Sequence, residues 1–223
     1  MKTKITHLIL AGLFGATIAS QAAVTIIPTG LNLGDQYRLV FVTSTTTAAT
    51  SSDIDFYNTF VNTAAALNSD LAGISWTAIA STADDDARDN TSTTGTGVGI
   101  YLLNDTVFAS NYTALWGTNI ENPLQIDESG NNSGNISVWT GSTTSGTEDV
   151  DSLGDSIVNY GANRFYNSVP NAGYWISRNF SAANTTSNSL YAMSELLTVV
   201  PEPSSTALLG LGLSSLLLRR RRS

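Results

Sequence analysis

The amino-acid sequence predicts a strand-dominated α+β domain with one clear helix near its start. Three observations support this prediction. Short runs of β-branched and aromatic residues recur along the chain, segments rich in Ser, Thr, Asn and Gly separate them, and a single segment has helical periodicity. The chain of 223 residues contains no cysteine, so packing alone must stabilise the domain.

The first predicted elements are a central strand and the helix. Residues 37–43 are rich in β-branched and aromatic side chains, which is typical of a strand in the middle of a sheet. The helix is expected to start at Ser52, with Asp55 three residues later as in a capping box. Its apolar residues at helical spacing are Tyr57, Phe60, Val61, Ala64 and Leu67.

The remaining elements are predicted to be strands. Segments 99–103 and 106–109 flank Asn104-Asp105, a two-residue turn whose residues both tolerate positive φ, so a hairpin is expected. The same composition predicts further strands at 74–80, 136–140, 173–176 and 190–193.

The first 22 residues have the order of a secretory signal peptide. Lys2 and Lys4 precede an apolar stretch from Ile5 to Ala19, and the small residue Ala22 stands where a signal peptidase cleaves. A buried N-terminal helix is the alternative interpretation. We therefore expect residues 1–22 to be a signal peptide, 23–199 the mature domain and 200–223 a separate C-terminal segment.

The C-terminal segment combines a stiff entry, a short apolar run and a basic end. The apolar run, residues 206–218, is shorter than the roughly 20 residues that a spanning helix needs. Arginines after it favour the cytoplasmic side, so the run predicts a transient hold in the inner membrane. An ordinary C-terminal anchor is the alternative. The residues that define this segment are Pro201, Glu202, Pro203, Arg219, Arg220, Arg221 and Arg222.

This segment closely resembles the PEP-CTERM sorting signal, which has a Pro-Glu-Pro motif, a short apolar helix and a terminal arginine cluster in this order. The resemblance implies recognition by an exosortase, removal of the tail near the motif, and release or attachment at the outer surface. It further implies a Gram-negative bacterium and an association with exopolysaccharide and biofilm. Signal peptidase and exosortase are therefore the partners expected during export, with the cell surface or extracellular matrix as the destination.

The mature domain is strongly acidic. Between residues 23 and 199, four arginines stand against 17 acidic residues and no lysine, which gives a formal charge of −13. Such a surface repels nucleic acid and anionic lipid and attracts cations, so nucleic-acid binding is excluded.

Catalytic chemistry is restricted by the residues that are missing. The single histidine, His7, lies in the signal peptide, and cysteine is absent. This excludes Ser-His-Asp triads, cysteine nucleophiles and the usual zinc, copper and haem sites. Calcium binding by oxygen ligands and acid/base work by paired carboxylates remain. The carboxylates considered for a glycoside hydrolase are Asp127, Glu128, Glu148 and Glu195.

Two acidic clusters are candidate calcium ligands. The first cluster consists of Asp84, Asp85, Asp86 and Asp89. The second consists of Glu148, Asp149, Asp151 and Asp155, and its spacing does not match an EF-hand. A solvated acidic loop is the favoured interpretation of both clusters, and calcium is the alternative. Arg88 is expected to pair with a carboxylate of the first cluster.

The four tryptophans divide into two groups. Trp76, Trp139 and Trp175 lie in predicted strands and are assigned to the core. Trp116, with Tyr112 nearby in a polar segment, is the candidate for exposure and for stacking on a ligand.

Several short motifs follow one another along the core. They are Phe41-Val42-Thr43-Ser44, Trp76-Thr77-Ala78, Asp86-Ala87-Arg88-Asp89, Tyr101-Leu102-Leu103, Asp105-Thr106-Val107, Asp127-Glu128-Ser129-Gly130, Val138-Trp139-Thr140-Gly141 and Leu190-Tyr191. In this order they are similar to bacterial endostatin-like proteins of the C-type lectin-like fold. The resemblance implies a non-catalytic adhesion domain that binds a polysaccharide or an extracellular protein. A purely structural surface protein and a carboxylate-based glycoside hydrolase are the alternatives.

The chain departs from these relatives in two respects. Where they usually carry cysteines, it has Ala64 or Ala65 and Ala192, so the stabilisation that a disulfide gives is absent. Glu121-Asn122-Pro123 has the letters of the lectin sugar motif in another order. Calcium-dependent sugar binding through that loop is therefore not inferred.

Overall fold

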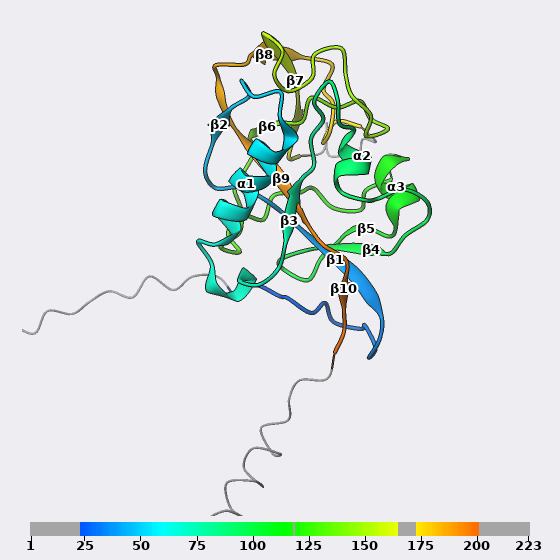
Figure 1. The fold of residues 1–223 in the computed structure, drawn as a ribbon. Coiled ribbons are helices and arrows are strands. Elements are labelled where there is room, and N and C mark those ends of the chain that lie inside the picture. Colours follow the sequence, from blue (N-terminus) through cyan, green and yellow to red (C-terminus); the bar gives the residue numbers. More distant parts are fainter. Residues whose placement is uncertain (1–22, 118, 165–172, 201–223) are drawn as a thin grey trace, which may run out of the picture.

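Two strands from opposite ends of the domain lie side by side at the centre of the sheet (Figure 1). β1 (Gln36–Val42) and β9 (Ser187–Ser194) pair antiparallel, with Val40 opposite Met193. Six of the seven residues of β1 are buried, as expected for a strand that is covered on both faces. The computed structural model describes residues 23–117, 119–164 and 173–200.

The other strands extend the sheet on both sides of this pair. β4 (Gly99–Leu102) runs parallel to β1 and continues through a hairpin into β5 (Val107–Ala109). β6 (Ser137–Trp139) runs parallel to β9, and β7 (Ile157–Ala162) and β8 (Ser181–Ala183) follow antiparallel. The order is β5-β4-β1-β9-β6-β7-β8. Three short strands pair beside this path: β2 (Thr47–Ala48) and β3 (Trp76–Ala78) with β9, and β10 (Leu197–Thr198) with β1.

The predicted helix is present as α1 (Ile54–Ala65), which packs against β3 and β9. Its buried residues include Tyr57, Val61 and Ala64, which follow the helical spacing of the sequence. The N-cap is Asp53 rather than Ser52, because the Asp53 side chain accepts a hydrogen bond from the Asp55 amide. The other helical segments are short: η1 (Ser69–Leu71), α2 (Ala87–Asn90) and α3 (Tyr112–Trp116).

The core contains the three tryptophans that the sequence assigns to it. Trp76, Trp139 and Trp175 are all almost completely buried, which confirms that prediction. Trp76 packs edge-on against Phe41 at 4.8 Å between ring centroids, and Trp175 packs edge-on against Phe108 at 5.2 Å. These contacts join β3 to β1 and the turn around Trp175 to β5.

Residues 173–176 form a turn, so the strand predicted there is wrong. The amide of Ser177 donates a hydrogen bond to the carbonyl of Gly173 at 2.7 Å, which closes the turn. The turn packs so tightly on β7 that a Cβ at Gly161 would lie 1.8 Å from the carbonyl oxygen of Trp175. A buried turn needs large apolar side chains just as a strand does, and this explains the error.

The structure confirms a strand-dominated α+β domain. The C-type lectin-like fold and the domain limits 23–199 stay predictions. The predicted signal peptide, residues 1–22, and the C-terminal residues 201–223 lie outside the described part of the chain. Within the described part, no helix has the length and the apolar character that crossing a membrane requires.

Candidate functional site

A pocket lies where three segments from distant parts of the sequence meet. Backbone hydrogen bonds join these segments: the Arg88 amide donates to the Gly146 carbonyl at 3.1 Å, and the Tyr112 amide donates to the Thr96 carbonyl at 2.9 Å. The pocket, here called the Trp116 pocket, has a volume of about 350 Å³. It is lined by Arg88, Thr93, Thr94, Gly95, Tyr112, Thr113, Trp116, Gly117 and Ser145.

Trp116 is half-buried and held in one orientation. It ends α3, whose first turn is capped by Asn111 Oδ1 accepting a hydrogen bond from the Ala114 amide at 2.7 Å. Its indole Nε1 donates to Thr93, 3.0 Å from Oγ1 and 3.2 Å from the carbonyl oxygen. The ring stacks on the buried Trp175 with the centroids 6.0 Å apart. Trp116 was predicted to be exposed and is half-buried, on a ring that needs no reordering to meet a ligand.

Tyr112 is buried, with 6% of its surface exposed, which corrects its predicted exposure beside Trp116. Its hydroxyl accepts a hydrogen bond from Arg38 Nε at 2.7 Å, and the Arg38 guanidinium lies 5.5 Å from the ring centroid. Gly97, with φ +63°, packs against the ring so closely that a Cβ there would come within 2.0 Å of it. Tyr112 thus forms a wall of the pocket and offers no free aromatic face.

Arg88 brings a positive charge to the pocket. Its guanidinium lies 3.5 Å from the Asp86 carboxylate, which confirms the predicted ion pair. The Arg88 side chain is 41% exposed, so the pair contributes only about 0–1 kcal/mol to stability. Its guanidinium has five N–H donors and the pair engages one nitrogen, so other donors remain for a ligand.

The lining of the Trp116 pocket suits a hydroxyl-rich ligand. Thr94, Thr113 and Ser145 are exposed, and each hydroxyl can both donate and accept a hydrogen bond. The indole of Trp116 offers apolar surface for C–H groups. Because Arg88 is already paired and the domain is strongly acidic, a neutral ligand fits this pocket better than an anionic one.

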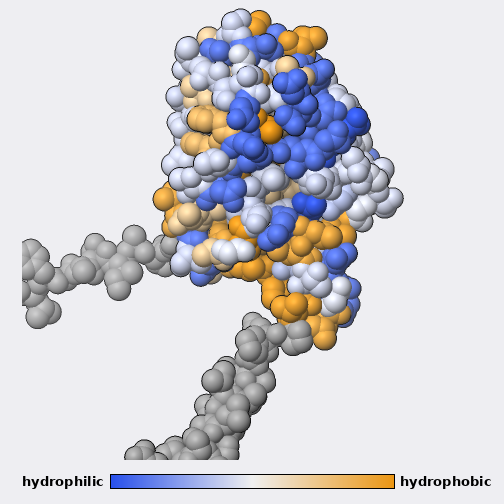
Figure 2. Space-filling model, in the orientation of Figure 1, coloured by the Kyte–Doolittle hydropathy of each residue, from blue (hydrophilic) through white to orange (hydrophobic). Residues whose placement is uncertain are grey.

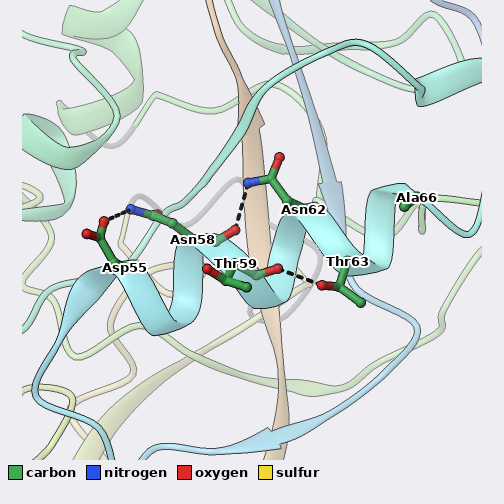
Figure 3. A pocket seen from close by; sticks show the side chains of 6 residues that line it. All are labelled: Asp55, Asn58, Thr59, Asn62, Thr63 and Ala66. Atoms are coloured by element: carbon green, nitrogen blue, oxygen red, sulfur yellow. Dashed lines mark hydrogen bonds between the residues drawn. The ribbon is translucent and has the colours of Figure 1, made fainter.

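A second, wider hollow lies along the exposed side of α1 (Figure 3). Its volume is about 620 Å³, and it is lined by Asp55, Asn58, Thr59, Asn62, Thr63 and Ala66. Its asparagines already serve the fold: Asn62 Oδ1 accepts from the Trp76 amide at 3.0 Å, and Asn58 Oδ1 accepts from the Ala78 amide at 2.9 Å. Unlike the Trp116 pocket, this hollow has no aromatic side chain in its lining, and the side-chain oxygens of both asparagines are committed to β3.

The two acidic clusters meet in space. The Glu148 amide donates to Asp86 Oδ1 at 2.6 Å, so the loop that begins with Asp84 and Asp85 lies against the second cluster. Thr82 Oγ1 donates to Asp85 Oδ2 at 3.4 Å, while Asp84 and Asp89 are exposed. Asp86 thus holds two loops together, a role that sequence reasoning did not anticipate.

The second cluster also works mainly as a set of loop anchors. Asp149 Oδ2 accepts from Asn159 Nδ2 at 3.1 Å, and Asp155 Oδ2 accepts from the Ser152 amide at 2.9 Å. Asp151 accepts a hydrogen bond from the Ser181 hydroxyl. Among the described residues, no group of three His, Cys, Asp or Glu side chains is arranged to hold a metal ion. Calcium binding by the clusters stays an untested prediction.

Two of the carboxylates considered for hydrolysis are buried. Glu128 is fully buried and accepts hydrogen bonds from the Ser44 amide and hydroxyl. Asp127 Oδ1 accepts from the amides of Ser129 at 2.9 Å and Asn131 at 2.8 Å, and these bonds fix the turn at residues 127–131. This turn lies beside the end of β1, because Asp127 bridges to Val42. The carboxylate of Glu195, in contrast, accepts only from the Ser75 amide, at 3.3 Å, among the described residues. Asp127 and Glu128 therefore organise loops rather than line the Trp116 pocket.

The pocket contains residues that the sequence identified and others that it did not. Trp116 and Tyr112 were noted together as a candidate for ligand stacking and Arg88 separately as an ion-pair partner, and the structure brings all three to one pocket. Thr93, Thr94 and Ser145 were missed, because nothing in a Ser/Thr-rich sequence distinguishes the hydroxyls that line a pocket from those of ordinary loops.

The described structure ends at Val200, two residues after β10. A family model described as the PEP-CTERM protein-sorting motif matches residues 199–222, which include Pro201, Glu202, Pro203 and all four terminal arginines. The chain carries a PEP-CTERM sorting signal. This signal marks an exported protein that is targeted to an exosortase, processed by it and directed toward the cell surface. No curated protein matches the chain.

Proposed function

We propose that this PEP-CTERM protein is a non-catalytic binding protein of the Gram-negative cell surface or extracellular matrix. Its mature domain binds a saccharide through the Trp116 pocket. This saccharide belongs to an exopolysaccharide or a biofilm. During export, residues 206–218 hold the chain transiently in the inner membrane, with Arg219–Arg222 on the cytoplasmic side.

One observation carries the binding proposal. The half-buried indole of Trp116 is fixed by Thr93 and Trp175 beside a guanidinium and the exposed hydroxyls of Thr94, Thr113 and Ser145. Preorganised aromatic surface next to polar groups is what a small-ligand site requires. The absence of histidine and cysteine from residues 23–199 and the burial of Glu128 support a non-catalytic role.

The test is a titration of neutral oligosaccharides into the processed protein, followed by calorimetry and by tryptophan fluorescence. Trp116 is half-buried while Trp76, Trp139 and Trp175 are buried, so a change in emission reports mainly on the pocket. We expect saturable binding that Trp116→Ala abolishes.

Trp116→Ala also removes a stacking partner of Trp175, so a milder pair of variants serves as the control. Thr94→Val in the pocket deletes one hydroxyl and should weaken binding about 3–10-fold, the range of one hydrogen bond. Thr59→Val makes the same change in the α1 hollow and should leave affinity unchanged. If both Thr94→Val and Trp116→Ala bind as tightly as the wild type, the saccharide binds at another site. Absence of binding to every saccharide would favour a purely structural surface protein.

A further inference from the structure

Three exposed apolar side chains lie next to β10: Leu196 directly before it, Val200 two residues after it, and Leu33 across from its end. Leu33, Leu196 and Val200 are 67%, 42% and 62% exposed. β10 pairs antiparallel with the start of β1, and the Gly34 amide donates to the Val199 carbonyl at 2.9 Å, so Leu33 and Val200 are neighbours. We call these three residues the basal patch. Figure 2 shows apolar surface concentrated at this end of the molecule, below a more hydrophilic upper part.

The patch is close in sequence to the segment predicted to enter the membrane. Only five residues, 201–205, separate Val200 from the apolar run 206–218. Fully extended, five residues span at most about 17 Å. The polar layer on each side of a bilayer is about 5–8 Å thick, so the tether keeps the base of the domain at or near the headgroups.

The apolar basal patch is better suited to contact with a bilayer surface than the acidic surface of the rest of the domain is. The mature domain carries a formal charge of −13, which disfavours contact with anionic lipid. The basal patch consists of apolar side chains, which can enter the interface of a zwitterionic bilayer. Tethering raises the effective concentration of the bilayer at the patch, so even a small apolar area suffices for contact.

We propose that the basal patch rests on the bilayer surface while the PEP-CTERM tail is embedded. The contact orients the domain with β10 toward the lipid and the Trp116 pocket toward solvent, and it keeps residues 201–203 at the bilayer surface for processing. This inference rests on the proposed membrane hold. Removal of the tail ends the tether and releases the base from the bilayer.

The natural absence of cysteine allows a direct test, because an introduced cysteine is the only thiol in the chain. The protein used comprises residues 23–223 and carries Leu33→Cys, which is labelled with an environment-sensitive fluorophore. It is mixed with vesicles of phosphatidylcholine and phosphatidylethanolamine. Val150→Cys is the matched control, because the Val150 side chain is 93% exposed. It lies in a loop that is hydrogen-bonded to β7 rather than to β10. Vesicle flotation measures the hold of the tail separately.

We expect the chain to float with the vesicles. The probe at Leu33 should shift to the blue and be quenched by a lipid-borne quencher, while the probe at Val150 stays in water. A floating chain whose two probes behave alike overturns docking and leaves the membrane hold intact. A chain that does not float overturns both. A blue shift at Leu33 without vesicles would assign the patch to self-association instead.

Discussion

Tyr57 joins the first helix to the loop before it through its hydroxyl group. The hydroxyl donates to the Ser51 carbonyl at 2.7 Å and accepts from the Ser51 amide at 3.1 Å. Its ring is fully buried on α1. Burial raises the pKa of Tyr57 to about 12, although the backbone of Ser51 lowers the pKa slightly. The folded protein therefore needs this phenol in its neutral form.

This requirement predicts a loss of stability in alkali. An unfolded tyrosine has a pKa of about 10, so the contribution of Tyr57 is fully present below pH 10 and is lost as the pH rises from about 10 to about 12. Tyr57→Phe should destabilise the protein by about 1–3 kcal/mol at pH 8, because both Ser51 groups lose their partner. Urea unfolding at pH 8 and pH 11 measures the gap between the two proteins.

The gap should shrink at pH 11, because only the wild type has this phenol to deprotonate. Burial also raises the pKa of Tyr37 and of Tyr191, but both residues remain in the variant and so cancel in the comparison. A gap of equal size at both pH values would show that Tyr57 does not titrate with unfolding in this range.

At the scale of elements, the most unusual contact is between α1 and the outer edge of β3. Among the described strands β3 pairs only with β9, and its other edge is covered by side-chain amides. Asn62 donates to the Trp76 carbonyl and accepts from the Trp76 amide, as a neighbouring strand would. Asn58 and Asn90 do the same for Ala78. Covering an edge in this way protects it from pairing with another chain.

Asn62→Ala should expose this edge. We expect a loss of about 1–3 kcal/mol in the free energy of unfolding, because Trp76 is buried and its backbone groups lose their partners. We also expect faster aggregation on heating, measured by light scattering. Thr63→Ala is the control: Thr63 is exposed on the same helix and bonds only within it, to the Thr59 carbonyl at 2.9 Å. Equal behaviour of the two variants would show that the asparagine does not protect the edge.

Elements with a strong local pattern were predictable from sequence. β1 and β9 contain runs of β-branched, aromatic and other apolar residues, which favour a buried strand, and α1 has a clear helical period. The hairpin between β4 and β5 was also confirmed, but its predicted two-residue turn was wrong: residues 103–106 connect the strands, and of Asn104 and Asp105 only Asp105, at φ +70°, has a positive φ. The short strand β7 was missed, because Asn159, Tyr160 and Gly161 interrupt its apolar pattern.

The candidate site was predictable only in part. Trp116 stood out because it is large and lies in a polar segment, but its partners Thr93 and Trp175 are distant in sequence. No local pattern reveals which loops a sheet of this topology brings together. For the same reason, the hydrogen bond between Asp86 and the Glu148 amide could not be foreseen.

On the scale of the whole molecule, acidic charge is largely unneutralised. Residues 23–199 contain four arginines, and the fold uses three of them locally. Arg38 is buried against Tyr112 and donates to the Ser194 carbonyl at 2.7 Å, and the Arg178 guanidinium lies 5.3 Å from the Tyr160 ring centroid. Arg88 pairs with Asp86. Most carboxylates therefore repel one another across the surface, and this repulsion opposes folding.

This repulsion predicts that salt stabilises the processed protein. At 0.1 M ionic strength charges more than about 10 Å apart are largely screened, so NaCl should raise Tm. Because the carboxylates of both acidic clusters anchor loops, we expect CaCl₂ to raise Tm no more than MgCl₂ at the same ionic strength, in thermal unfolding followed by circular dichroism. Asp84→Asn, at an exposed carboxylate, should leave the response to calcium unchanged. If CaCl₂ alone raises Tm further and Asp84→Asn abolishes this extra rise, the first cluster holds a calcium site. Calcium bridging to an anionic polysaccharide is then the binding mechanism to examine.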